Sequence, residues 1–167
     1  MLTDKTHPFV TGAHGLKQKH ILYIYSTRLL LERLSWYARD NGNQKALPIF
    51  EYRSNTNYDE MRDYFHYLRN LTPPTQISWG NVEYWDFRIL PKKQSRLLQA
   101  SDNSCGAIKD GFEYDGFGNV EPRYVQSFSS CFYRHRGKLF SYGFKFLHTN
   151  AEILEELKNE YEWLKII

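Results

Sequence analysis

The chain has 167 residues, of which 41% are hydrophobic and 25% charged, and its formal net charge is +3. These proportions exclude an intrinsically disordered chain and are typical of a globular domain that buries its own core. Because neither an apolar leader nor a stretch of membrane-spanning length occurs, we expect a soluble, cytoplasmic protein. The net positive charge is too small to indicate a nucleic-acid partner by itself.

The first half of the chain alternates between helical and extended patterns. After a loop over residues 1–19, apolar residues at helical spacing predict a helix over 20–39. A strand is expected over 46–53. A second helix is expected over 58–70, with Asn57 as its N-cap and acidic residues in its first turn.

The second half continues the alternation. Prolines at 73 and 74 end the second helix. The remaining elements expected in chain order are strands over 76–79 and 84–89, a helix over 94–111, a helix from Pro122 to 134, an extended segment over 139–147 and a final helix over 150–164. This alternation predicts an α/β fold with one domain over residues 1–167.

Basic and aromatic residues leave two interpretations open. Thirteen Tyr, eleven Phe and four Trp suit either base stacking or an aromatic core. The basic clusters are either phosphate contacts or a solvated surface; they are Arg134, His135, Arg136 and Lys138, and Lys92, Lys93 and Arg96. The two cysteines, Cys105 and Cys131, have no CxxC spacing and predict neither a zinc site nor a disulfide framework.

Several short motifs occur in an order that resembles a known family. They are Thr3-Asp4-Lys5, Phe50-Glu51-Tyr52-Arg53, Leu98-Gln99-Ala100-Ser101-Asp102 with Ser104 to Ile108 after it, Glu121-Pro122-Arg123-Tyr124, Arg134-His135-Arg136-Gly137 and Tyr142-Gly143-Phe144-Lys145. Together they resemble the DUF3800 family of RNase H-like proteins. The resemblance implies a single RNase H-like domain with a mixed sheet flanked by helices, and a metal-dependent nuclease or phosphoesterase activity.

Members of that family begin with a strand that carries an Asp-Glu-Ser motif, and no segment of this sequence matches it. The resemblance therefore implies that the chain is the C-terminal portion of such a fold, without its first strands. A sheet without those strands leaves unpaired edges. We accordingly expect pairing with a missing N-terminal segment or a homo-oligomer.

RNase H-like nucleases hold two Mg²⁺ or Mn²⁺ ions between carboxylates that come from separate elements. By resemblance, Glu51 and Asp102 are the expected catalytic residues and metal ligands, and Asp4 is a further metal ligand. Lys5, Arg53 and Gln99 are the expected substrate-binding residues.

Each of these site residues has a structural alternative. Asp102 can be a surface acid near a helix N-terminus, and Glu51 with Arg53 an exposed ion pair. Asp4 with Lys5 can belong to a flexible terminus, and Gln99 can cap its helix. Two other functions therefore stay open beside the nuclease: a non-catalytic interaction or regulatory module, and a domain that binds nucleic acid through basic and aromatic residues.

Overall fold

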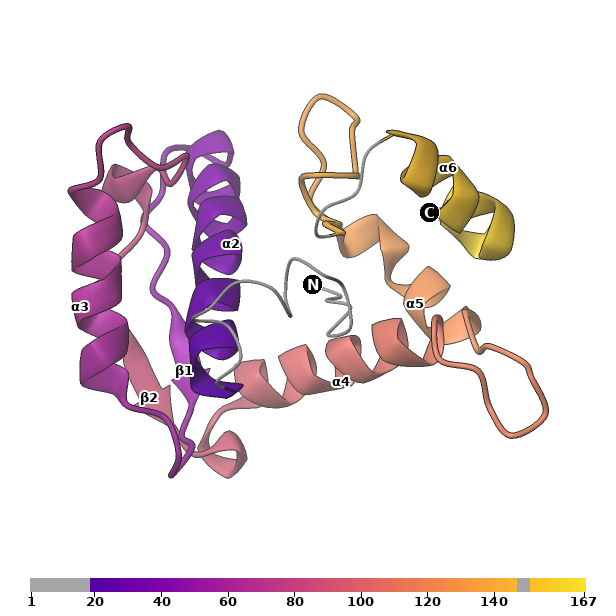
Figure 1. Cartoon of the computed structure of the whole chain (residues 1–167), viewed down its shortest axis with the longest axis horizontal. Coiled ribbons are helices and arrows are strands. Elements are labelled where there is room, and N and C mark those ends of the chain that lie inside the picture. Colours follow the sequence, from indigo (N-terminus) through magenta and orange to yellow (C-terminus); the bar gives the residue numbers. More distant parts are fainter. Residues whose placement is uncertain (1–18, 147–150) are drawn as a thin grey trace. The chain divides into compact units, whose positions relative to one another are not determined.

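A computed structural model of the chain describes residues 19–146 and 151–167, with side chains from residue 23 onward (Figure 1). The described residues form two compact units, which divide between Ser95 and Arg96. We call residues 19–95 the N-terminal unit and residues 96–146 with 151–167 the C-terminal unit. We expected one domain over the whole chain. The buried apolar residues of the described part form two clusters, one within each unit, and the single domain stays a prediction.

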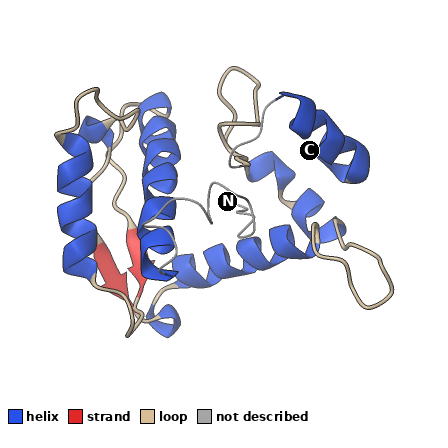
Figure 2. Cartoon of the chain, in the orientation of Figure 1, coloured by secondary structure: helices blue, strands red, loops and turns tan. Residues whose placement is uncertain are grey.

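The N-terminal unit contains a β-α-β arrangement preceded by a long helix (Figure 2). The elements are α2 (Lys19–Asp40), β1 (Ile49–Glu51), α3 (Tyr58–Arg69) and β2 (Arg88–Leu90), with 3₁₀ turns at Trp79–Asn81 and Lys92–Gln94. β1 and β2 pair in parallel, with Phe50 opposite Ile89 and Glu51 opposite Leu90. Helices and a small parallel sheet confirm the expected α/β class.

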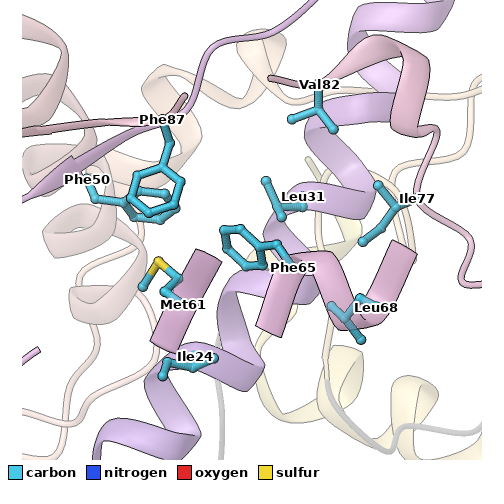
Figure 3. Packing of buried hydrophobic residues seen from close by; sticks show 9 residues of the cluster. All are labelled: Ile24, Leu31, Phe50, Met61, Phe65, Leu68, Ile77, Val82 and Phe87. Atoms are coloured by element: carbon cyan, nitrogen blue, oxygen red, sulfur yellow. The ribbon is translucent and has the colours of Figure 1, made fainter. Parts of the chain in front are cut away.

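The core of the N-terminal unit joins one face of the sheet to α2 and α3 (Figure 3). Phe87 lies at the centre of an aromatic group, with its ring centroid 5.0 Å from that of Phe50 and 5.9 Å from that of Phe65. The apolar residues of α3 recur at helical spacing, so one face of this helix is buried. The buried residues of the cluster are Ile24, Leu31, Phe50, Met61, Phe65, Leu68, Ile77, Val82 and Phe87.

Two helix predictions are confirmed here. The helix expected over 20–39 runs from Lys19 to Asp40. The helix expected over 58–70 ends at Arg69, and the side chain of Asn57 accepts hydrogen bonds from the amides of Asp59 and Glu60, at 3.1 and 3.3 Å. These side-chain bonds satisfy amides that have no partner inside the helix.

The strands are shorter than the alternation of residues predicts. The strand expected over 46–53 is regular only at Ile49–Glu51, and Ala46 forms an isolated bridge with Val82. The segment expected as a strand over 76–79 instead leads into a 3₁₀ turn. A side chain takes the place of a neighbouring strand there: the backbone amide of Ser78 donates a hydrogen bond of 3.0 Å to the hydroxyl of the buried residue Ser35.

The C-terminal unit contains three helices and a long irregular segment. The helices are α4 (Arg96–Asp110), α5 (Arg123–Ser127) and α6 (Ala151–Glu160), with 3₁₀ turns at Ser129–Cys131 and Glu162–Lys165. The core consists of Val125, Leu139, Phe144, Trp163 and Leu164. The Trp163 indole donates to the carbonyl oxygen of Gly111 at 2.8 Å, which ties the last turn of the chain to the end of α4.

Three elements of this unit differ from the prediction. The helix expected from Pro122 to 134 ends at Ser127, whose hydroxyl donates to the carbonyl oxygen of Tyr124. The final helix ends at Glu160 and continues as a 3₁₀ turn. The segment expected to be extended over 139–147 forms, in its described part, turns and an isolated bridge between Phe140 and Phe144. No helix in the described ranges is long and apolar enough to cross a bilayer.

Candidate functional site

Glu51 lies at the carboxyl end of β1, directly beside the end of the parallel strand β2. Ligands of open α/β sheets bind outside the carboxyl ends of parallel strands. The Tyr58 hydroxyl donates to the carbonyl oxygen of Glu51 at 2.6 Å and accepts from the Arg53 amide at 2.8 Å. The first residue of α3 therefore fixes the backbone on both sides of Tyr52.

The exposed side chain of Arg53 lies against an aromatic ring at this strand end. Its guanidinium carbon is 5.1 Å from the ring centroid of Tyr23, a distance typical of a cation–π interaction. Burial raises the pKa of the Tyr23 hydroxyl, and the charge of Arg53 acts in the opposite direction. The phenol therefore stays neutral beneath the cation at physiological pH.

Asp102 lines an open groove of about 460 Å³ between α4 and α5. Tyr124, Ser127 and Phe128 contribute the opposite wall, and Asp110 is a second carboxylate in the same groove. We did not predict Asp110 from the sequence. The sequence feature that could have indicated it is the spacing of Asp102 and Asp110, which lie eight positions apart. The small residues at 106 and 107 between them leave room for a groove. Gln99 lies one turn before Asp102 on the same helix and is exposed.

The expected site residues are thus distributed over both units. Glu51 and Arg53 belong to the N-terminal unit, and Gln99 and Asp102 to the C-terminal unit. Asp4 and Lys5 lie outside the described residues. Within the described part of the chain, no group of three or more His, Cys, Asp or Glu side chains is close enough to hold a metal ion. Convergence of Glu51 and Asp102 on one ion stays a prediction.

A short hairpin in the C-terminal unit contains the tightest basic cluster of the sequence. We call residues 134–138 the basic hairpin. His135 and Lys138 exchange backbone hydrogen bonds of 3.1 and 3.0 Å. Arg136 and Gly137, between them, have φ angles of 50° and 78°. Positive φ at both central residues defines the two-residue turn that best matches the twist of a hairpin.

Acidic residues are absent from the sequence around the basic hairpin. Between Glu121 and Glu152 the chain contains no Asp or Glu, whereas it contains Arg123, Arg134, Arg136, Lys138 and Lys145. Arg136 and Lys138 are exposed. In the described residues, no ion pair joins either of them to a carboxylate. Both residues are in contact with solvent, from which an external anion can approach them.

Arg134 has a structural role beneath the turn. Its guanidinium donates to the carbonyl oxygens of Ser129 and Phe132, at 3.2 and 3.4 Å. This arrangement attaches the base of the basic hairpin to the 3₁₀ turn that follows α5. The side chains at the tip, rather than Arg134, are the ones that extend into solvent.

Aromatic rings lie directly beside the basic hairpin. The imidazole of His135 stacks on Tyr142, with ring centroids 4.9 Å apart and planes 24° apart. Tyr133 meets Tyr142 edge to face, with centroids 6.3 Å apart. We recognised the basic cluster in the sequence but missed its pairing with Tyr142. This pairing depends on the turn over residues 139–144, which has no simple sequence pattern.

Four acidic residues of the C-terminal unit lie close together, at the end of α4 and in the loop that follows it. Asp110, Glu113, Asp115 and Glu121 line a second depression there. Hydrogen bonds from Arg123 lower the pKa of the Glu121 carboxyl to about 2, and backbone amides of Asn119 and Phe117 lower that of Asp115. Glu121 and Asp115 therefore stay ionised below neutral pH.

Comparison of the chain with protein-family models, with curated proteins and with solved structures found no match.

Proposed function

We propose that the protein binds nucleic acid through the basic hairpin of its C-terminal unit. The observation that carries this proposal is the turn at Arg136 and Gly137, which presents two exposed cations in a segment without any acidic residue. Phosphate groups attract such cations, and the release of condensed counterions supplies affinity that does not depend on base sequence.

The backbone conformation of Arg136 supports a role beyond turn formation. A non-glycine residue at positive φ is uncommon, and Asn is the residue best suited to that position before Gly. Arg therefore occupies a place where another residue would stabilise the turn better. A phosphate contact explains the choice, because the guanidinium fork matches two phosphate oxygens.

The test measures fluorescence anisotropy of a labelled oligonucleotide over a range from about 50 to about 200 mM salt. The variants are Arg136→Asn and Lys138→Gln, alone and together. Arg136→Asn keeps or improves the turn while it removes the charge, so lost affinity is not a folding defect. Lys165→Gln, on the last 3₁₀ turn, is the matched control, because it removes one exposed positive charge elsewhere in the same unit.

We expect the double variant to bind more weakly, with the logarithmic salt dependence reduced by roughly one for each lost phosphate contact. Lys165→Gln should bind like the original protein. Absence of salt-dependent binding contradicts the proposal. Equal weakening by Lys165→Gln contradicts the assignment to the basic hairpin.

A second candidate function is the metal-dependent nuclease or phosphoesterase of an RNase H-like, DUF3800-type fold. Glu51 at the carboxyl end of a parallel strand and Asp102 in the groove beside α5 support it. In this proposal Glu51, Asp102 and Asp4 hold Mg²⁺ or Mn²⁺. Lys5, Arg53 and Gln99 contact the substrate.

Calorimetric titration with Mn²⁺ tests this second candidate without requiring a substrate. Glu51→Gln and Asp102→Asn should each abolish the same binding event, because each removes a ligand of one centre. Asp63→Asn is the control, an exposed acid on α3. Cleavage of a labelled oligonucleotide in the presence of Mg²⁺ should be lost in the same two variants. Unchanged Mn²⁺ binding in both variants contradicts the shared centre.

A further inference from the structure

We infer that His135 and Tyr142 form a stacking surface for an unpaired base, so that the nucleic acid bound by the basic hairpin is single-stranded. This inference rests on the proposed function. It adds to that function the class of nucleic acid that the same site selects.

The two rings already adopt the geometry of a base stack. Their centroids are 4.9 Å apart and their planes differ by only 24°, whereas Tyr133 meets Tyr142 at 84°. Both His135 and Tyr142 are half-buried, and neither belongs to the buried core of the unit. An aromatic surface of this kind receives a base of any identity, because each base has a π-face.

A cation lies on the same side of the hairpin as the stacked rings. His135 and Lys138 are directly opposite each other and share both backbone hydrogen bonds. Side chains of such a pair project from the same face, with Cα atoms about 5.5 Å apart. The Lys138 ammonium is therefore placed to contact the phosphate that follows a base stacked on the rings. Arg136, at the tip, is placed for a neighbouring phosphate.

This combination distinguishes single strands from duplexes. Bases inside a duplex are stacked on each other and cannot lie flat on an external ring, whereas the bases of a single strand can. A duplex would meet only the two cations of the basic hairpin. The structure thus predicts a preference for single strands that is added to the phosphate attraction.

The test compares three labelled ligands at one salt concentration: a single-stranded oligonucleotide, its duplex, and a single strand of equal length made of abasic sites. The abasic strand keeps every phosphate and removes every base. We expect the single strand to bind roughly tenfold or more tightly than either of the others. Tyr142→Leu should reduce single-strand affinity to the abasic value, and Tyr142→Phe, which keeps the ring, should retain most of it.

A second pair of variants keeps the test decisive if Tyr142→Leu fails to fold. His135→Phe retains a stacking ring and should retain the preference for the single strand, whereas His135→Ala should lose it. If all three ligands bind equally well, the stacking inference is overturned. If Arg136→Asn and Lys138→Gln still weaken that binding, the proposed function stays in place. Absence of binding to all three ligands overturns both.

Discussion

The imidazole of His135 stacks on the ring of Tyr142 with centroids 4.9 Å apart, across a turn that brings residues 139–144 back to the basic hairpin. Gly143 permits this return. A Cβ added at Gly143 would overlap the carbonyl oxygen of Tyr133 and lie 2.9 Å from its amide nitrogen. The aromatic and basic parts of the candidate site therefore depend on one close approach of two backbone segments.

Replacement of Gly143 by Ala should unfold or rearrange the C-terminal unit. The new methyl group meets backbone rather than a flexible side chain, so the free energy of unfolding should fall by at least about 2 kcal/mol. The indole ¹⁵N–¹H signal of Trp163, which is buried in this unit, reports the change during urea unfolding. Gly116→Ala is the control, since a Cβ there meets nothing within 4 Å. Equal stability of both variants contradicts the close approach.

Replacement of Tyr58 by Phe should loosen the strand end that carries Glu51. The change removes only the hydroxyl that bridges the Glu51 carbonyl oxygen and the Arg53 amide. We expect a loss of about 1 kcal/mol and faster hydrogen exchange of the Arg53 amide. Tyr52→Phe removes the hydroxyl of an exposed neighbour and should change neither quantity. Unaltered exchange at Arg53 in Tyr58→Phe would show that the bridge is not formed.

Replacement of Asn57 by Ala should destabilise the start of α3 by about 1 kcal/mol, because the amides of Asp59 and Glu60 lose their acceptor. Hydrogen exchange of these two amides is the direct measurement. Asn55→Ala is the control, because it changes the same residue type at an exposed position two residues earlier and should leave the exchange of both amides unchanged. If the amides of Asp59 and Glu60 exchange as slowly in Asn57→Ala as in the original protein, the N-cap is contradicted.

The ion pair between Glu121 and Arg123 should make the C-terminal unit sensitive to acid. Hydrogen bonds from Arg123 hold the pKa of Glu121 at about 2, below its ordinary value of 4.5. Because the pKa of Glu121 is lower in the folded than in the unfolded state, the ionised carboxylate stabilises the fold at any pH above about 4.5. This stabilisation is lost as the pH falls from about 4.5 towards 2.

An NMR titration of the Glu121 side-chain carboxyl carbon measures that pKa. Arg123→Gln should move the midpoint upward, towards 4.5, since both the side-chain hydrogen bonds and the charge of the guanidinium are lost. High salt should move it in the same direction, because an exposed pair is screened. A midpoint near 4.5 in the original protein would refute the pair.

The sequence predicted the elements that local chemistry determines. Asn57 begins α3 because its short side chain reaches two amides in the next turn, and α2 follows from apolar spacing alone. The parallel pairing of β1 with β2, and the position of Glu51 at its carboxyl end, agree with the alternation of strands and helix.

The rest of the candidate site depends on contacts between distant residues. The stack of His135 on Tyr142 needs the close approach at Gly143, and no spacing rule encodes it. Asp110 joins the groove of Asp102 only because α5 packs beside α4. The grouping of the buried apolar residues into two clusters depends on such contacts too, because helical spacing shows which residues are apolar but not which cluster they join.

In our proposal, the basic hairpin and its stacked rings contact a single-stranded nucleic acid. The most direct measurement is a two-dimensional ¹⁵N–¹H NMR titration of the labelled protein with a short single-stranded oligonucleotide. We expect the largest shift changes on residues 133–145, with the Arg136 and Lys138 amides among them. Arg136→Asn together with Lys138→Gln should reduce these changes at the same oligonucleotide concentration. Shift changes confined to the N-terminal unit, or none at all, would contradict it.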